Sequence, residues 1–380
     1  MTIREGEDTA DVVFSPEAKL KIIRNLDEIG IPEIELGYLG AIDEQYRFAK
    51  SIEREGINAK IGSHNRAYTK ENEWKDEIDR AVDAGADIIT FIGWVSDVTL
   101  RGMPWIKKED IPERIAKCVE YAKGQGIQTC VGVGLSPSAL DLTVRCWILA
   151  EQAGADRFSV GSGTGATRPE ALSFMVGFLR NVIGPRPEIA LHCHNDFGLA
   201  TALTLEGIKA GAGIADVAVN GLGHNSGIAA LEEVVVCLSV LYGVETGVSM
   251  DRLCELSKLV EDLSGVSLSP NKSVVGKNFY RHQLDSHIAS ILRGDNYSWE
   301  NIAPEALGRK RTLEWMSGRF RRGKSGSIMA KIEQMGLKVD DDQFNAVSQA
   351  VQDAIERKRL LSENEVEEII RHFLRFSLSK

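Results

Sequence analysis

A short pattern that recurs along the first two thirds of the chain constrains the fold more than any other feature. Each copy is an amphipathic helical run, then a glycine, then a short β-branched strand, as at residues 28–35, 84–90 and 153–159. Glycine suits the left-handed backbone at a helix C-terminus, and a strand that is apolar on both faces is typical of a parallel sheet. The pattern therefore predicts repeated βα units.

The number of these units predicts a barrel. Eight units fit a (β/α)8 TIM barrel better than an open doubly wound sheet. We therefore expect an α/β TIM barrel over residues 1–245 and a mainly helical C-terminal extension over residues 246–380 that serves as a lid or dimerisation region. The first helix is expected to start at Ser15-Pro16-Glu17. The strands are expected to end near Ile3, Glu35, Ile61, Phe91, Val131, Val160, Leu191 and Val219.

Composition and charge exclude several classes of protein. With 43% apolar and 26% charged residues, the 380-residue chain is typical of a globular protein and not of a disordered one. The net charge of −10 argues against general affinity for nucleic acid or anionic membranes. No stretch reaches the roughly 18 apolar residues of a membrane span, and the first residues lack the layout of a secretory signal. The six cysteines form no CxxC pair and are interpreted as reduced core residues, so we expect a soluble cytoplasmic protein.

Two histidines at the end of an expected strand predict a metal site. In TIM barrels the reactive groups come from the C-terminal ends of the strands and the loops after them. His192 and His194 lie two residues apart on the seventh expected strand, so their side chains project to the same side. The alternative is a pair of hydrogen-bonded core histidines, but the polar Asn195 and Asp196 that follow favour metal binding.

A carboxylate near the start of the chain completes the predicted ligand set. A divalent cation needs an anionic oxygen, and the Arg4-Glu5-Gly6-Glu7 run on the first expected strand supplies one. In a closed barrel the first strand lies next to the eighth, one strand from the seventh, so we predict Glu5 as the third ligand. The alternative is an exposed carboxylate at a frayed N-terminus.

At these residues the chain resembles the metal-dependent Claisen-type acyltransferases that include homocitrate synthase, 2-isopropylmalate synthase and lyase relatives such as HMG-CoA lyase. The signature of this family is Arg-(Asp/Glu)-Gly-Glu on the first strand and His-x-His-Asn-Asp on the seventh, and these motifs stand here at residues 4–7 and 192–196. Glutamate at the ligand position is more similar to homocitrate synthase. The likeness extends over nearly the whole chain and includes the two-histidine spacing at residues 282–287.

The resemblance implies an acyl-CoA-dependent acyltransferase that condenses acetyl-CoA, or a similar acyl-CoA, with a 2-oxo acid. It implies a divalent cation (Mg, Mn, Zn or Co) held by Glu5, His192 and His194, where it would polarise the keto carbonyl. Arg4 would then stabilise the developing alkoxide. Family members are implied to be homodimers whose small-molecule substrates are the 2-oxo acid and the acyl-CoA, with no nucleic acid or membrane partner.

The resemblance also implies roles for residues outside the ligand set. In relatives the segment with the two histidines reaches an active site of the dimer, which makes His287 the first choice for proton transfer and His282 the second. Asp196 and Asn220 would orient reacting groups. The implied substrate-binding residues are Arg66, Asn220, Thr164 and His224.

The chain departs from the family on loops that face the substrate. Relatives have Glu-Asp-Ala-Ser-Arg after the fifth strand, whereas this chain has residues 135–139, so Ala139 replaces an arginine that would clamp a distal carboxylate. The motifs after the sixth and eighth strands, at residues 162–165 and 223–228, differ as well. We therefore expect altered acceptor specificity. Relatives also carry several residues before the arginine motif, so a short first strand or an internal start is expected.

Other readings stay open at this stage. The cationic residues between Arg309 and Lys324 are interpreted as a solvated or intersubunit surface, so no residue is assigned to coenzyme A. The same metal platform also suits a carbon–carbon lyase or aldolase. Two histidines and one carboxylate further match the facial triad of non-haem Fe(II) oxygenases, and a catalytically silent binding protein is the remaining alternative.

Overall fold

The computed structural model describes residues 1–52, 56–134, 139–162, 166–316 and 325–377. The chain divides into two compact units, Met1–Leu268 and Ser269–Lys380. The sequence placed this boundary at residue 245. The first unit extends further because helix α10 (Leu253–Ser264) contacts helix α1 (Pro16–Glu28) and the 3-10 turn η5 (Val219–Gly221).

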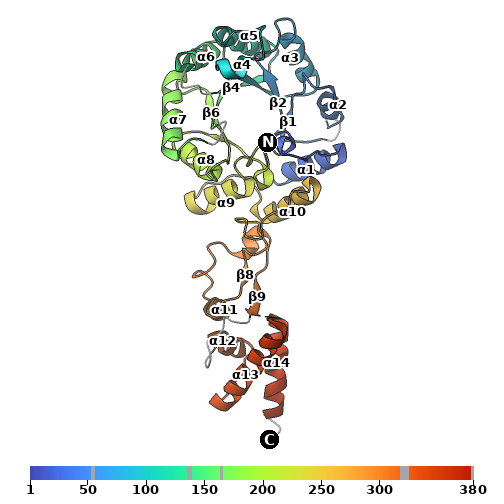
Figure 1. The fold of residues 1–380 in the computed structure, drawn as a ribbon, viewed down its shortest axis with the longest axis vertical. Helices are drawn as coiled ribbons and strands as arrows, with labels where there is room; N and C mark the ends of the chain where they lie inside the picture. Colours follow the sequence, from blue (N-terminus) through green and yellow to red (C-terminus); the bar gives the residue numbers. More distant parts are fainter. Residues whose placement is uncertain (53–55, 135–138, 163–165, 317–324, 378–380) are drawn as a thin grey trace. The chain divides into compact units, whose positions relative to one another are not determined.

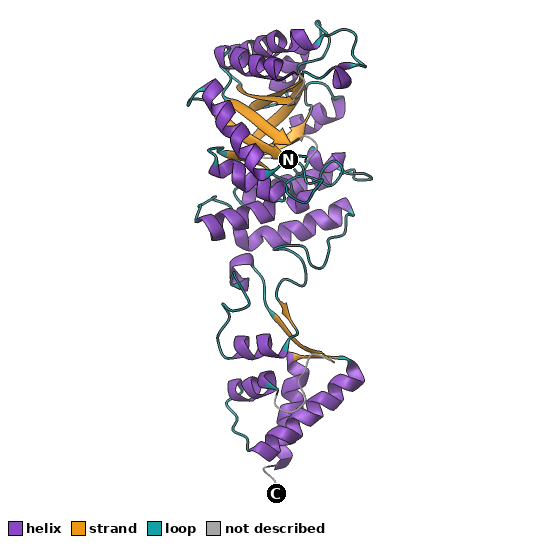
Figure 2. Cartoon of the chain, turned by 60° about the vertical axis from the view of Figure 1, so that its left-hand side comes forward, coloured by secondary structure: helices purple, strands orange, loops and turns teal. Residues whose placement is uncertain are grey.

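The first unit contains a curved sheet of parallel strands with helices around it (Figures 1 and 2). The strands are ordered β1 to β7 as in the sequence, and each neighbouring pair is parallel. This arrangement confirms the expected TIM-barrel fold class. The strands are β1 (Glu33–Gly37), β2 (Lys60–Arg66), β3 (Ile88–Trp94), β4 (Gln128–Gly134), β5 (Arg157–Ser162), β6 (Glu188–Cys193) and β7 (Ile214–Asp216). The remaining helices of this unit are α2 (Asp43–Ile52), α3 (Trp74–Asp83), α4 (Asp97–Leu100), α5 (Ile111–Gly124), α6 (Leu140–Gln152), α7 (Pro169–Ile183), α8 (Ala200–Lys209) and α9 (Leu231–Tyr242), with 3-10 turns η3 (Lys108–Asp110) and η6 (Met250–Arg252).

The local signals for helix ends operate as expected. Gly30, Gly85 and Gly154 follow helices and have φ values of 92°, 84° and 93°, in the region that favours glycine. Helix α1 begins at Pro16, and the Ser15 hydroxyl accepts a hydrogen bond from the Ala18 amide at 3.2 Å. These local features set where the helices end and begin next to the strands.

The first expected strand is not formed. Residues 2–4 form a turn that leads into the 3-10 helix η1 (Glu5–Asp8). The Glu5 amide donates to the Met1 carbonyl at 2.9 Å and the Gly6 amide to the Thr2 carbonyl at 3.2 Å, so local bonds use the groups that a sheet ladder would need. The expectation of a strand ending near Ile3 was therefore wrong. The last strand of the first unit, β7, ends at Asp216. The sequence placed the end of this strand near Val219, where the structure has η5.

The N-terminal turn joins the two edges of the sheet. Within the described chain, β7 and β1 are the edge strands and share no ladder. The Thr2 hydroxyl accepts from the Val219 amide at 3.0 Å, and the Thr9 hydroxyl accepts from the Gly223 amide at 2.9 Å, which ties the turn to the segment after β7. On the other side Arg4 Nε donates to Glu35 Oε1 on β1 at 2.6 Å. The turn thereby carries Glu5 to the C-terminal end of the barrel.

The second unit is mainly helical, as expected, but it also contains a small sheet that the sequence analysis did not anticipate. Strand β9 (Thr312–Met316) pairs in parallel with β8 (Arg281–His282) and antiparallel with β10 (Leu360–Ser362). The helices and turn are α11 (Asp285–Leu292), η7 (Pro304–Leu307), α12 (Gly326–Gln334), α13 (Asp341–Lys358) and α14 (Glu363–Ser377). The core includes Trp315, Ile328, Phe344, Val351 and Ile370. In the described parts of both units, no helix is long and apolar enough to cross a membrane.

The close approach of the turn after β1 to α3 gives a stability test. A Cβ atom added at Gly40 would lie 1.9 Å from the Glu77 carbonyl oxygen, whereas one added at Gly177 in α7 would meet nothing within 4 Å. We expect Gly40→Ala to lower the free energy of unfolding by about 2 kcal/mol or more, because backbone must move. Gly177→Ala should raise it by up to about 1 kcal/mol through helix propensity. Urea unfolding followed by circular dichroism measures both, and equal values for the two variants would contradict this packing.

Candidate metal centre

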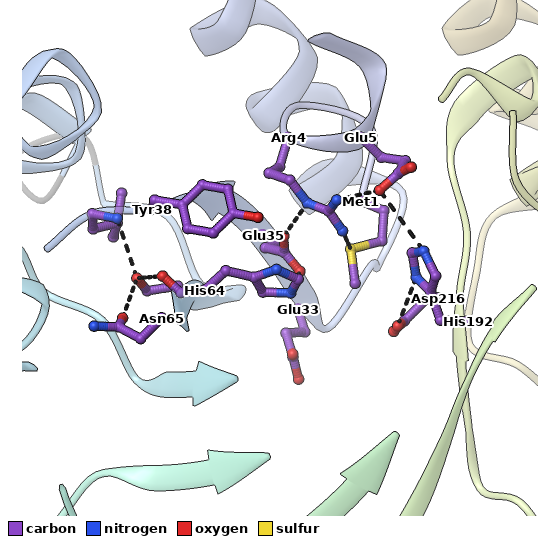
Figure 3. Close-up of polar contacts among 12 residues, drawn as sticks. Met1, Arg4, Glu5, Glu33, Glu35, Tyr38, His64, Asn65, His192 and Asp216 are labelled. Atoms are coloured by element: carbon purple, nitrogen blue, oxygen red, sulfur yellow. Dashed lines mark hydrogen bonds and ion pairs between the residues drawn. The ribbon is translucent and has the colours of Figure 1, made fainter. Parts of the chain in front are cut away.

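Three side chains with metal-binding atoms converge at the C-terminal end of the barrel. They are Glu5 on η1, His192 on β6 and His194 directly after β6, and one ligand atom of each lies within 4.8 Å of the others. His192 Nε2 is 3.8 Å from Glu5 Oε2, and Figure 3 shows the two side chains facing each other. The fold thus brings together the residues that the sequence analysis selected as ligands, and their role as ligands stays a prediction.

The alternation of β6 places the two imidazoles on one side. Their rings lie edge to face with centroids 5.1 Å apart. Cys193, between them, is fully buried, and burial raises the pKa of its thiol to about 12, so this thiol is protonated near neutral pH in the metal-free protein. A bridge from His194 to Ile228 then fixes the backbone where the strand ends.

Unpaired buried atoms indicate that these residues fit a cation. Glu5 Oε2 and His194 Nδ1 are buried and make no hydrogen bond within the described part of the chain, although Glu5 Oε2 contacts the Arg4 guanidinium as an ion pair. Burial of such groups without a partner costs free energy. Two imidazole nitrogens and a carboxylate oxygen are donors that divalent transition metals accept. Both the geometry and the donor set therefore suit a divalent cation.

The electrostatics of the site keep the ligands in their metal-binding forms. Burial acts to raise the pKa of Glu5, but Arg4 and then the two histidines outweigh it and hold the pKa below its usual value. Burial lowers the pKa of His194, with a further contribution from His192. A carboxylate and a neutral imidazole are the forms that bind metals.

A buried chain of polar groups holds Arg4 beside the ligands. Glu35 Oε1 accepts from Arg4 Nε at 2.6 Å, and Glu35 Oε2 lies 2.9 Å from His64 Nε2. Although burial acts to raise the pKa of Glu35, Arg4 and His64 outweigh it and lower the pKa strongly. Glu35 and His64 were not selected from the sequence. Their signal is an ionisable side chain within an expected strand of a parallel barrel, where a buried charge needs a partner.

Further polar groups surround the ligands. Asp216 Oδ2, at the end of β7, is 3.3 Å from His192 Nδ1, and Figure 3 shows His192 between Glu5 and Asp216. The ring of His224, which is exposed, lies 6.4 Å from that of His194. Asp196 Oδ1 accepts from Asn225 at 3.3 Å while Asp196 Oδ2 is buried without a hydrogen bond in the described residues. Of these, Asp216 was not selected from the sequence.

The other residues expected to bind substrate are placed differently. Arg66 lies at the end of β2 with its guanidinium carbon 4.5 Å above the Tyr38 ring. Asn220 Nδ2 donates to the Ser257 carbonyl at 2.9 Å and its Oδ1 accepts from the Ser257 hydroxyl, so this side chain ties η5 to α10. The expected role of Asn220 in substrate binding stays a prediction. Thr164 lies outside the described residues.

The two histidines of the second unit have defined surroundings there. The His287 ring on α11 stacks on the Trp299 ring with centroids 3.6 Å apart and an angle of 20° between the planes. Burial lowers the pKa of His287, with a smaller contribution from His282. His282 Nε2 is 3.1 Å from Glu300 Oε1, which also accepts from Arg311 at 3.0 Å. Arg311 of the cationic run thus has a structural partner, whereas residues 317–324 of that run are outside the described residues.

Comparison with known proteins identifies relatives along most of the chain. Residues 1–260 match the family described as HMGL-like, and residues 274–359 match the homocitrate synthase post-HMGL domain-like family. A putative (R)-citramalate synthase of Methanopyrus kandleri is 37% identical over 97% of this chain and 70% of the relative. The homocitrate synthase AksA of the same organism is 34% identical over 98% of this chain and 91% of the relative. The solved HMG-CoA lyase of Bacillus subtilis shares the fold, with a TM-score of 0.62 and 21% identity over 72% of this chain and 95% of that chain.

The buried Glu35 carboxylate makes the stability of the protein depend on pH. Because its pKa is lowered from the ordinary 4.5, its contribution is complete above about pH 4.5 and is lost as the pH falls towards the lower folded-state pKa. We expect Glu35→Gln to lower the free energy of unfolding by about 3 kcal/mol at pH 7, because Arg4 loses its buried partner.

The difference between the native protein and Glu35→Gln should shrink as the pH falls below about 4.5, since protons then bind this carboxylate in the unfolded chain and stabilise the unfolded state of the native protein. Urea titrations at several pH values measure it. Glu44→Gln, which changes an exposed carboxylate on α2, is the control and should stay within about 0.5 kcal/mol of the native protein. A difference for Glu35→Gln that does not vary with pH would contradict the buried ion pair.

Proposed function

The chain belongs to the HMGL-like family, and from this membership we propose that it is an acyl-CoA-dependent acyltransferase that condenses acetyl-CoA, or a similar acyl-CoA, with a 2-oxo acid. The observation that carries the proposal is the convergence of Glu5, His192 and His194 beside the buried Arg4 guanidinium. The names of the relatives, citramalate synthase and homocitrate synthase, support this reaction class.

The three ligands prepare the site for a 2-oxo acid. Two neutral imidazoles and one carboxylate leave a divalent cation with one net positive charge, which attracts the carboxylate of the acceptor. The cation, when bound, supplies Lewis-acid polarisation of the keto carbonyl. Glu5 would hold it from η1, while His192 and His194 would hold it from β6. The ligand set is compatible with Mg, Mn, Zn or Co.

Arg4 is proposed to stabilise the alkoxide that forms at the keto carbon. Its guanidinium is held by Glu35 through Nε and contacts Glu5 through Nη1. Burial acts to lower the pKa of Arg4, but Glu35 and Glu5 outweigh it and raise the pKa, so the positive charge is permanent. A charge that is already positioned stabilises a developing oxyanion without reorganisation of the site.

His287 is proposed to transfer the proton from the acyl-CoA. Its lowered pKa keeps the imidazole neutral near pH 7, which is the form that a general base needs. Removal of the proton from the α-carbon creates the nucleophile that attacks the keto carbon, and water then cleaves the thioester to release coenzyme A. Stacking on Trp299 restricts the ring to one orientation. Homodimer formation and a cytoplasmic location stay predictions.

The acceptor is proposed to lack a distal carboxylate. Ala139, which stands where relatives carry an arginine, is buried at the start of α6 with 4% of its surface exposed. A methyl group cannot form the paired hydrogen bonds with which arginine holds a carboxylate. Pyruvate and branched 2-oxo acids should therefore be better acceptors than 2-oxoglutarate. The second candidate function is a lyase, which the altered loop at His224 suggests. Cleavage of 2-hydroxy acids or their CoA esters at the same metal site would identify it.

The overall reaction is tested by thiol release. We expect free coenzyme A only when acetyl-CoA, a suitable 2-oxo acid and a divalent cation are all present. Glu5→Gln should lower this rate by roughly 100-fold, because a neutral amide is a poor substitute for an anionic ligand. Glu44→Gln is the control with unchanged activity. The lyase would be favoured if no 2-oxo acid of a broad panel leads to thiol release and 2-hydroxy acids are cleaved instead.

The role of His287 is tested separately from metal binding. We expect His287→Ala to lower kcat by about 100-fold or more while the affinity for the metal stays unchanged. In the native protein the activity should fall as the pH drops through the pKa of His287, which lies below the ordinary 6.5, since protonation removes the base. This acidic limb should be absent in the variant. His372→Ala, on α14 of the same unit, is the control, and a His287→Ala variant with native kcat would contradict the assignment.

A further inference from the structure

We infer that Asp216 is a positioning residue that holds His192 in the tautomer and orientation required for metal binding. The inference deepens the proposed function, because it rests on the metal site formed by Glu5, His192 and His194. It concerns an interaction between two neighbouring strands, and Asp216 belongs to neither of the two sequence motifs that predicted the ligands.

The strand register places Asp216 beside His192. In the parallel pairing of β6 with β7, His192 and Asp216 are direct partners, and side-by-side residues of parallel strands project to the same face. Asp216 is the last residue of the short strand β7, so its carboxylate lies at the same height as the imidazole. The resulting distance from His192 Nδ1 to Asp216 Oδ2 is 3.3 Å.

The two nitrogens of His192 face different partners. Nδ1 faces Asp216, and Nε2 faces Glu5 Oε2 at 3.8 Å, as Figure 3 shows. An ionised carboxylate only accepts hydrogen bonds, and a neutral imidazole has a single N–H. When Nδ1 donates to Asp216, the lone pair of Nε2 is therefore directed towards Glu5 and is available to a cation.

The other ligand histidine lacks this support. His194 Nδ1 is buried without a hydrogen bond in the described residues, and its ring contacts the rings of His192 and His224. His192 is thus the ligand whose orientation is set by a carboxylate. The unequal surroundings assign the positioning role to Asp216 alone.

Within the described chain, the Asp216 carboxylate has His192 as its hydrogen-bond partner. The N-terminal ammonium of Met1 also interacts electrostatically with this carboxylate. The hydrogen bond between Nδ1 of His192 and this carboxylate therefore holds the imidazole in one orientation.

Metal affinity provides the first test. We expect Asp216→Ala to weaken the binding of Co²⁺ and Zn²⁺ by roughly 10- to 100-fold in competition with a chromophoric chelator. Asp216→Asn keeps an oxygen that accepts from Nδ1, so its metal affinity should fall less. This variant also provides the affinity test if Asp216→Ala does not fold. Glu188→Gln, which changes a carboxylate at the opposite end of β6, is the control with native affinity.

Two observations would overturn the inference. One is a folded Asp216→Ala variant whose metal affinity lies within twofold of the native value. The other comes from ¹⁵N NMR of the metal-free native protein at mildly alkaline pH. We expect the proton of the neutral His192 ring on Nδ1, and a proton on Nε2 would contradict the proposal. If the native protein binds no divalent cation, the proposed function fails, but the NMR measurement still decides whether Asp216 sets the tautomer.

Discussion

The ion pair between Arg4 and Glu35 is the contact on which the site depends. It joins the N-terminal turn to β1 through a hydrogen bond of 2.6 Å, and both side chains are largely buried. A buried charge without a partner would cost several kcal/mol, so each group requires the other. Because Glu5 follows Arg4 directly, the position of this carboxylate depends on the same contact. The bonds of Thr2 and Thr9 to the segment after β7 hold the turn from its other side.

The charges around the ligands are arranged so that a cation can bind without prior changes in protonation. Glu5 is kept ionised by Arg4, and His194 is kept neutral by burial. Glu5 Oε2 and His194 Nδ1, which lack a hydrogen bond in the described part of the chain, stay buried at a cost that a bound cation would reduce. Asp216 adds a second negative charge next to His192. The site is therefore organised by neighbouring side chains before any ligand arrives, which limits the reorganisation that a reaction would require.

Sequence patterns predicted the barrel and the ligands because both depend on short-range periodicity. The glycines at positions 30, 85 and 154 end helices as expected, and the spacing of His192 and His194 places them on one side of β6. The patterns failed where the outcome depends on distant partners. The segment at Ile3 has strand-like residues, yet its amides bond locally, and the contact of Asn220 with Ser257 of α10 was not foreseen. The sheet of the second unit was missed for the same reason, since its short strands pair across long stretches of chain.

The amino-acid sequence by itself determined the repeated βα units, the common direction of His192 and His194 and the presence of a carboxylate next to Arg4, because neighbours along the chain set each of these. Tertiary structure decided which side chains support them. Glu35 meets Arg4 only when the N-terminal turn crosses to β1, and Asp216 meets His192 only in the observed register of β6 and β7. These partners lie far apart along the chain, so the pattern around either residue does not identify the other.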